Sequence, residues 1–333
     1  MGKKISLAHG SGGQLTRELV ENIFVPKFRN DALSRLSDSA ELDFAGGRLF
    51  FTTDSFVIKP LEFPGGDIGK LAVCGTVNDL AVAGARPLWI SCGLIIEETF
   101  DIDRLEQLVS SIAATAAAAG VSVVCGDTKV VERGGADGLF INTAGIGAAL
   151  AGYRAGSVGP GDVILVSGTI GDHEAAVFRV REQLGRKLDI SSDCAPLNGL
   201  VEAMIAAAPS IRVMRDPTRG GVGAVLNELA GGTGCSFNIN EEAIPIRDEV
   251  RGMCELVGFE PIYLANEGKI VCIAPAEAAG ELLAAMRAHP LGRDAAIIGQ
   301  VLADRRERVF MQSPYGGSRI ISMPAGTQLP RIC

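Results

Sequence analysis

Apolar segments of strand length alternate with longer segments of helical periodicity along most of the chain, which restricts the fold to mixed helices and sheets. The expected strands are 48–53, 88–96, 121–125, 139–147, 163–167, 270–274 and 296–301, and the expected helices are 70–83, 103–119, 277–288 and two that begin near Asp172 and Gly221. A Gly- and Pro-rich segment, 152–161, interrupts the pattern near the middle. Because 333 residues can bury two substantial cores, we predict an α/β (α+β) fold with two domains, 1–155 and 156–308.

The last segment, 309–333, is predicted to be a mobile tail that ends in Cys333. Prolines and glycines punctuate residues 313–333 and disfavour both helix and regular strand. Fully extended, about twenty residues reach on the order of 65 Å, far enough to bring a terminal thiol to distant parts of the body. From the tail alone, a frayed terminus with an incidental cysteine is the alternative interpretation.

Composition excludes several classes of partner. The formal net charge is -8, and no dense run of Lys and Arg suits nucleic acid or an anionic membrane, although local positive groups can still bind small phosphates. The first residues lack the apolar core of a signal peptide, and no stretch is a convincing membrane span, so we expect a cytoplasmic protein. The eight cysteines form no C-x-x-C pair or metal-binding cluster.

Glycine-rich segments precede two of the predicted helices. The segment Gly10, Ser11, Gly12, Gly13 leads into one helix, and Thr218, Arg219, Gly220 into another. Such loops let backbone N–H groups approach a phosphate at a helix N-terminus, although a flexible loop is the alternative for the first segment. Residues 64–70 resemble a phosphate loop, but the Walker spacing needs glycine at position 64 and Ser or Thr at 71, where the chain has Pro64 and Leu71. We therefore reject a P-loop NTPase.

Four aspartates lie where strands or a helix are expected to present polar groups: Asp54, Asp79, Asp127 and Asp216. Each has an ordinary alternative explanation, such as capping a turn. Together with the glycine-rich segments they indicate a nucleotide whose phosphates are held through Mg²⁺, because this cation prefers carboxylate, water and phosphate oxygens.

Eight motifs over the whole chain resemble those of the HypE family of hydrogenase maturation factors. They are His9–Gly13, Thr52–Ser55, Pro64–Lys70, Asn78–Asp79, Gly126–Val130, Asp216–Gly221, Asn266–Lys269 and the terminal Pro330–Cys333. This family belongs to the ATP-binding superfamily of aminoimidazole ribonucleotide synthetase and selenophosphate synthetase. The resemblance implies a two-domain aminoimidazole-ribonucleotide-synthetase-like architecture with a flexible C-terminal tail, a homodimer formed through the N-terminal domains, and ATP with Mg²⁺ between the halves.

The resemblance also implies the reaction. A HypF carbamoyltransferase places a carbamoyl group on the Cys333 thiol, and the HypE-type protein uses ATP to dehydrate it to an S-cyanate (thiocyanate). The HypC–HypD complex accepts the cyanide, which becomes a ligand of the [NiFe]-hydrogenase iron. The family pattern has glycine where this chain has Glu174. From the residues alone we expect Asp172 to cap a helix and His173 to be a polar partner.

The resemblance assigns roles to residues of this chain. Asp54, Asp79 and Asp216 are expected to bind Mg²⁺, with Asp127 as a further ligand or nucleotide contact. Lys129 and Glu267 are expected to polarise the carbamoyl group and move protons, although a phosphate clamp and a turn acceptor are their alternatives. The cofactor-binding set is Gly10, Ser11, Gly12, Gly13, Lys70, Asp127, Thr218, Arg219 and Gly220. Arg331 is expected to offset the terminal carboxylate. Whether the tail enters its own cleft or that of a dimer mate is left open.

Overall fold

The computed structural model describes residues 14–19, 21–22, 40–44, 46–183, 189–326 and 329–333. The predicted phosphate loop, Gly10, Ser11, Gly12 and Gly13, lies outside the described residues, and α1 (Gln14–Leu19) follows it. In the described part of the chain, no helix is long and apolar enough to cross a membrane.

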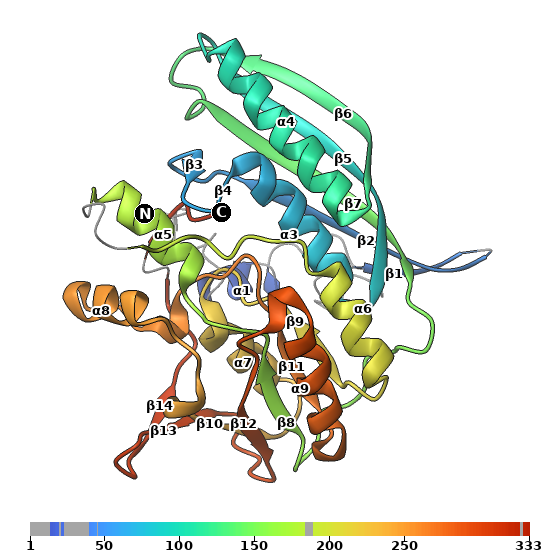
Figure 1. Ribbon diagram of the computed structural model, residues 1–333, viewed down its shortest axis with the longest axis vertical. Coiled ribbons are helices and arrows are strands. Elements are labelled where there is room, and N and C mark those ends of the chain that lie inside the picture. Colours follow the sequence, from blue (N-terminus) through green and yellow to red (C-terminus); the bar gives the residue numbers. More distant parts are fainter. Residues whose placement is uncertain (1–13, 20, 23–39, 45, 184–188, 327–328) are drawn as a thin grey trace.

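The first half is a five-stranded sheet with helices packed against it (Figure 1). Its strand order is β1 (Ala40–Phe44), β2 (Gly47–Phe56), β7 (Leu139–Ala149), β5 (Ala85–Glu97) and β6 (Ser122–Val131). A short hairpin, β3 (Glu62–Phe63) and β4 (Gly66–Asp67), precedes α3 (Ile68–Val82), and α4 (Ile102–Ala119) follows β5. The side chain of Asp67 caps α3 by accepting from the Lys70 N–H. The cap of α4 is Asp101, two residues before Asp103, where the sequence pattern places it.

The second half is a seven-stranded sheet covered on both faces. Its order is β14 (Ser318–Ile321), β13 (Val309–Gln312), β10 (Ser236–Asn240), β12 (Ala296–Leu302), β8 (Val163–Val166), β11 (Val271–Ala274) and β9 (Val213–Arg215). Alternate side chains pack toward α7 (Gly221–Ala230) on one face and toward α6 (Asn198–Ala207) and α9 (Ala279–Ala288) on the other. The other helices are α5 (Asp172–Arg181), α8 (Asp248–Val257) and the 3-10 turns Glu241–Ala243, Pro261–Tyr263, Ala276–Ala278 and Pro290–Gly292.

Most strand pairs are antiparallel, which changes where the polar residues lie. Among the described strands of the two large sheets, only β5–β6 and β10–β13 are parallel. The strand predicted to end at residue 125 continues to Val131, because pairing with β5 persists to Glu97. Asp127 and Lys129 therefore lie inside an exposed edge strand, and the expectation that they emerge at a strand end is wrong.

The expectation that residues 313–333 lack regular structure is wrong for Ser318–Ile321, which form β14, whereas the described residues 322–326 and 329–333 form no helix or strand. Strands β13 and β14 pair with each other, and β13 pairs with β10, so the second sheet includes residues up to Ile321. The Pro and Gly residues between them form the hairpin turn, in which Gly316 has φ 84°. Farther on, Leu329 and Ile332 are 7% and 3% exposed and join the core that links both halves. The domain bounds 1–155, 156–308 and 309–333 stay a prediction.

Candidate active site

A cleft of about 280 Å³ between the two halves brings together seven predicted site residues. They are Asp54 from β2, Asp79 from α3, Asp216, Thr218 and Arg219 from the loop before α7, Glu267 from the loop before β11, and Cys333 from the terminus. Residues up to 279 positions apart in the sequence (333 − 54) thus line one space, and the terminal thiol is among them. The arrangement has the acids, cation and nucleophile that group-transfer chemistry requires.

The floor of the cleft is formed by β2 and α3. Thr52 and Asp54 share one face of β2 because side chains alternate along a strand. The Thr52 Oγ1 hydroxyl donates to Asp79 Oδ2 at 2.7 Å, which fixes the Asp79 carboxylate against the strand. Burial raises the pKa of Asp54, and the positive charge of Arg219 opposes this change.

The opposite wall is the tight turn that begins α7. Gly220 and Gly221 have φ 79° and 61°, and a Cβ on Gly221 would lie 2.5 Å from the Leu264 carbonyl oxygen. This turn presents Arg219 to the cleft. Negative charge on the neighbouring Cys333 sulfur and on the carboxylates of Asp54, Glu267 and Asp79 raises the pKa of Arg219, so its guanidinium stays positively charged in the site.

The three aspartates predicted to bind Mg²⁺ line the same cleft but do not make a preformed cage. Among the described residues, no group of three Asp, Glu, His or Cys side chains is close enough to hold a metal ion. Mg²⁺ in nucleotide sites is commonly bound by one or two carboxylates, with water and phosphate oxygens completing the octahedron. One or two of Asp54, Asp79 and Asp216 can bind the ion in that mode, and their ligand roles stay a prediction.

Glu267 is a buried carboxyl in a tightly held loop. Its Oε1 atom is buried and has no hydrogen-bond partner among the described residues. Burial is the main cause that raises the pKa of Glu267 well above its usual range, and the acidic neighbours Cys194 and Asp216 add to it. The Asp193 carboxylate accepts hydrogen bonds from the backbone N–H groups of Glu267 and Gly268, each at 3.1 Å. Asp193 therefore fixes the loop from which the Glu267 carboxyl projects.

Asn78 ties this loop to the first half. It is 1% exposed and donates from Nδ2 to the carbonyls of Ala195 and Glu267, while its Oδ1 accepts the Leu197 N–H at 2.8 Å. This polar side chain is tolerated in an otherwise apolar helix because both its Nδ2 and its Oδ1 atoms form hydrogen bonds. Asn78 holds the Glu267 loop against α3.

The terminus enters the cleft of its own chain. Val57, just after β2, donates its backbone N–H to a terminal carboxylate oxygen of Cys333 at 3.1 Å. Arg331 does not offset that carboxylate as expected; its guanidinium forms an ion pair with Asp137 and lies 5.8 Å from the centre of the Phe140 ring. Burial raises the pKa of the Cys333 thiol well above its usual range, and Arg219 opposes this change.

Comparisons with known proteins identify the family of this chain. Residues 36–149 match the family AIR synthase related protein, N-terminal domain, and residues 159–312 match AIR synthase related protein, C-terminal domain. The chain is 52% identical to carbamoyl dehydratase HypE of Azotobacter vinelandii, over 99% of this chain and 97% of that protein. The chain belongs to the HypE family.

Solved structures of HypE proteins have the same fold. A crystal structure of HypE in complex with ATP has 46% sequence identity and a TM-score of 0.81, covering 99% of this chain and 100% of that one. The HypE–HypF complex has 46% identity and a TM-score of 0.87, covering 92% and 99%. The predicted family and the two-domain aminoimidazole-ribonucleotide-synthetase-like fold are confirmed.

Four described residues that the HypE resemblance assigns to the site do not line this cleft: Lys70, Asp127, Lys129 and Gly220, the last of which lines a neighbouring pocket. Lys70 Nζ donates to the Gly65 carbonyl at 2.8 Å. Lys129 and Asp127 form an exposed ion pair at 3.1 Å on β6, with both side chains 70% exposed. Their predicted roles remain predictions, and among the described residues Arg215 and Arg219 are the basic side chains that line the cleft with Glu267 and Cys333.

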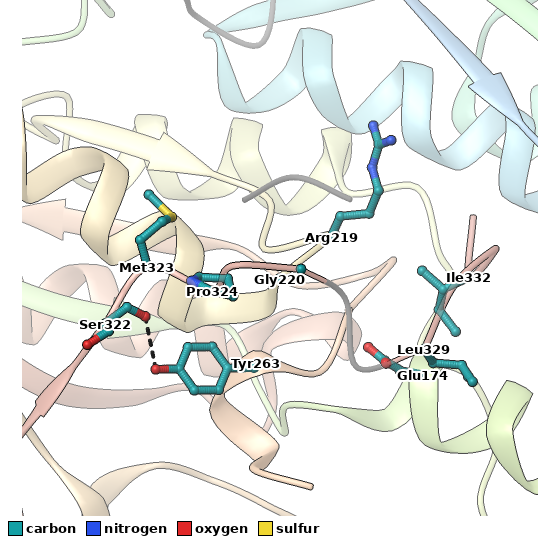
Figure 2. Close-up of a pocket in the computed structure, with 10 residues that line it drawn as sticks. Glu174, Arg219, Gly220, Tyr263, Ser322, Met323, Pro324, Leu329 and Ile332 are labelled. Atoms are coloured by element: carbon teal, nitrogen blue, oxygen red, sulfur yellow. Dashed lines mark hydrogen bonds between the residues drawn. The ribbon is translucent and has the colours of Figure 1, made fainter. Parts of the chain in front are cut away.

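Glu174, which departs from the HypE family pattern, lies under the docked tail (Figure 2). It is 3% exposed, and its Oε2 accepts the Ala265 N–H at 2.7 Å, while Oε1 is buried with no hydrogen-bond partner among the described residues. Gly171, rather than Asp172, is the N-cap residue of α5, so the predicted cap is wrong. Asp172 is buried and accepts from Thr169 Oγ1 at 2.5 Å.

Burial raises the pKa of Glu174 to about 7. An unfolded glutamate has a pKa of about 4.3, so between these values the folded chain binds more protons and its stability falls as pH rises. Between pH 5 and pH 8, the free energy of unfolding of the parent chain should fall by about 2 kcal/mol more than that of Glu174→Gln, which has no carboxyl to titrate. Urea denaturation at both pH values measures this, and an unchanged pH dependence would contradict it.

Sequence reasoning missed several residues that hold the site. Arg215 and Glu228 also line the cleft, Asp193 anchors the Glu267 loop, and Arg181 contacts the tail. Arg215 directly precedes the motif Asp216–Gly221, and the other three residues lie in no recognisable motif. Their contacts join segments that are distant in sequence, so local periodicity contains no signal for them.

Proposed function

We propose that this protein uses ATP to dehydrate an S-carbamoyl group on its own Cys333 to an S-cyanate, for delivery to the [NiFe]-hydrogenase iron centre. The observation that carries the proposal is the position of Cys333, which shares a cleft with Arg219, Glu267 and three aspartates. Family membership supports the same reaction, since the relatives are carbamoyl dehydratases and a HypE structure contains ATP.

The overall reaction converts the S-carbamoyl group and ATP into the S-cyanate, ADP and phosphate, so the elements of one water leave the carbamoyl group and end in the phosphate and the released protons. The carbamoyl oxygen attacks the γ-phosphorus of ATP, and ADP leaves. Two protons then leave the nitrogen, the carbon–oxygen bond breaks, and phosphate departs as the carbon–nitrogen triple bond forms. Phosphorylation is needed because a carbonyl oxygen is a poor leaving group, whereas phosphate is a good one.

Two side chains of the cleft suit the charge and proton transfers. The Arg219 guanidinium can neutralise negative charge on the carbamoyl and phosphate oxygens, as bidentate arginine contacts commonly do. Glu267 is the candidate base for the nitrogen protons, because a carboxylate with a raised pKa is a stronger base than an ordinary one. The Asn78 and Asp193 contacts hold it beside the tail.

Asp54, Asp79 and Asp216 are the residues that would hold Mg²⁺. When bound, the ion would neutralise phosphate charge and orient the nucleotide. The carboxylates themselves would set where the phosphates lie relative to the terminal thiol, because all three line the cleft that contains Cys333.

We also propose a homodimer formed through the first sheet. The edge strand β6 and its neighbour β5 expose Trp89, Ile95, Val124 and Val130, of which Val130 is 67% exposed. Exposed apolar surface on an open sheet edge is typical of an association surface. A second copy here would cover Lys129 and place it near a subunit boundary. Sedimentation equilibrium should give the dimer mass, and a monomer at micromolar concentration would contradict this.

The proposed partners are HypF, as the carbamoyltransferase, and the HypC–HypD complex, as the cyanide acceptor, all in the cytoplasm. A HypE–HypF complex is known for a relative.

To test the function, the chain is incubated with HypF, carbamoyl phosphate and ATP, and its terminal peptide is analysed by mass spectrometry. We expect a carbamoyl and then a cyano adduct on Cys333, and neither on Cys333→Ala. Phosphorylation of a small molecule with an unmodified terminus would instead indicate a kinase.

A further inference from the structure

The terminal residues 329–333 pack against the body without forming a helix or strand, so their carbonyls need other partners. A buried carbonyl that loses its water and finds no donor is costly. Four consecutive carbonyls, those of Pro330, Arg331, Ile332 and Cys333, each accept a hydrogen bond from the body. The donors therefore decide where the terminal thiol lies.

Arg181, at the end of α5, holds two of these carbonyls. Its Nη1 donates to the Pro330 oxygen at 2.6 Å and its Nη2 to the Arg331 oxygen at 2.7 Å. Its Nε donates to the Lys59 carbonyl at 2.9 Å, so one guanidinium joins the tail to the segment that follows β2. Lys59 completes the contact by donating its own N–H to the Arg331 oxygen at 3.3 Å. Arginine suits this task because its five N–H donors have a fixed fork geometry.

His173, at the start of the same helix, holds the next carbonyl. Its Nε2 lies 2.9 Å from the Ile332 oxygen and its Nδ1 lies 2.8 Å from Ser192 Oγ. Because a carbonyl only accepts, Nε2 must have the proton, and Nδ1 must accept from the Ser192 hydroxyl. Burial lowers the pKa of His173, which favours this neutral form. The Phe63 and His173 rings pack edge to face, with their centroids 5.2 Å apart.

The same contacts lead to Glu267. Ser192 Oγ also accepts the Cys194 N–H at 3.0 Å, and the intervening Asp193 holds the Glu267 loop and forms an ion pair with Lys269 at 3.1 Å. Thus one short segment, 192–194, contacts both the histidine that binds the tail and the loop that places the candidate base. Figure 1 shows the C-terminus beside α5 and β4, between the two halves.

We propose that His173 and Arg181 are positioning residues that form a latch on the terminal backbone and so place the Cys333 thiol in the cleft. The part of this inference that concerns turnover rests on the proposed dehydration; the docking itself does not. The latch binds main-chain oxygens, so it fixes the distance from α5 to the thiol whatever group the sulfur holds. Leu329 and Ile332 supply the apolar contacts that accompany it.

The first test measures how fast iodoacetamide labels Cys333 in the full chain, read from the terminal peptide by mass spectrometry. A docked thiol with a raised pKa reacts slowly. Arg181→Met and His173→Phe should each increase the labelling rate about tenfold to a hundredfold, as expected for losing one or two hydrogen bonds to a charged or buried group. His173→Gln, which keeps an N–H donor, should restore part of the protection.

The matched control is Arg179→Met. Arg179 lies on the same helix and donates to the Ile190 carbonyl at 3.2 Å, so its removal should leave Cys333 labelling unchanged.

The second readout is ATP affinity, which should stay within about twofold in all variants while dehydration slows in the two latch variants. Equal labelling in Arg179→Met and Arg181→Met, or loss of ATP binding together with thermal stability, would overturn the latch. If the latch variants are labelled faster but the parent chain itself does not dehydrate the carbamoyl group, the proposed function is wrong and the latch is still supported.

Discussion

Replacing Glu267 by glutamine should slow ATP-dependent dehydration of the carbamoylated chain by about 10²- to 10⁴-fold, the usual contribution of a positioned acid–base group. Glutamine keeps the shape of the side chain and leaves the loop contacts to Asp193 and Asn78 in place, since these use the backbone of Glu267. The variant removes only the ability of the carboxyl to take a proton. Single-turnover kinetics on the pre-carbamoylated protein measure the effect without the transferase step.

The matched control for this variant is Glu228→Gln, because Glu228 lines the same cleft. It should change the rate by less than about tenfold if proton transfer is specific to Glu267. ATP binding should persist in both variants. A Glu267→Gln protein that turns over like the parent would exclude Glu267 as the base and direct attention to Lys129 or to a residue of a second subunit.

Adding one alanine after Cys333 should reduce dehydration by at least about a hundredfold, the order of loss seen when a reacting group is displaced by about 1 Å. The terminal carboxylate accepts the Val57 N–H, and the three preceding carbonyls are held by Arg181 and His173. An extra residue must either displace the carboxylate into the cleft or pull the thiol out of it. Stopped-flow or quenched-flow rates on the carbamoylated protein would measure the loss.

The extension should leave ATP affinity largely intact, since the aspartates and Arg219 belong to the body. An internal control adds the alanine at the N-terminus, where no change in rate is expected. Equal loss of ATP binding and dehydration would mean that the tail is a structural element of the nucleotide site rather than a tethered substrate.

Local sequence patterns predicted the elements and the cleft residues that belong to strong motifs. The buried helix around Asn78, the glycine turn before α7 and the Glu267 loop lie where their patterns place them. Helical periodicity specifies the first and glycines with positive φ specify the second, whereas the third contains Gly268, where a Cβ would lie 1.9 Å from the Asp193 carbonyl oxygen.

The errors arose where pairing between distant segments decides the structure. Asp127 and Lys129 were placed at a strand end, but pairing to β5 extends β6 past them. The Pro and Gly residues of segment 313–333 predict no strand there, but β13 offers an edge on which β14 pairs. Contacts of Arg181 with the tail span about 150 residues, and a residue at the end of an ordinary amphipathic helix gives no sign of them.

The most direct test of the account is mass spectrometry of the purified, S-carbamoylated chain after ATP is added in the absence of any other protein. We expect the peptide ending in Cys333 to lose the mass of one water while ADP and phosphate appear in equal amounts. A carbamoyl peptide that persists through ATP addition, with dehydration only when another protein is supplied, would contradict it and make this chain a passive carrier.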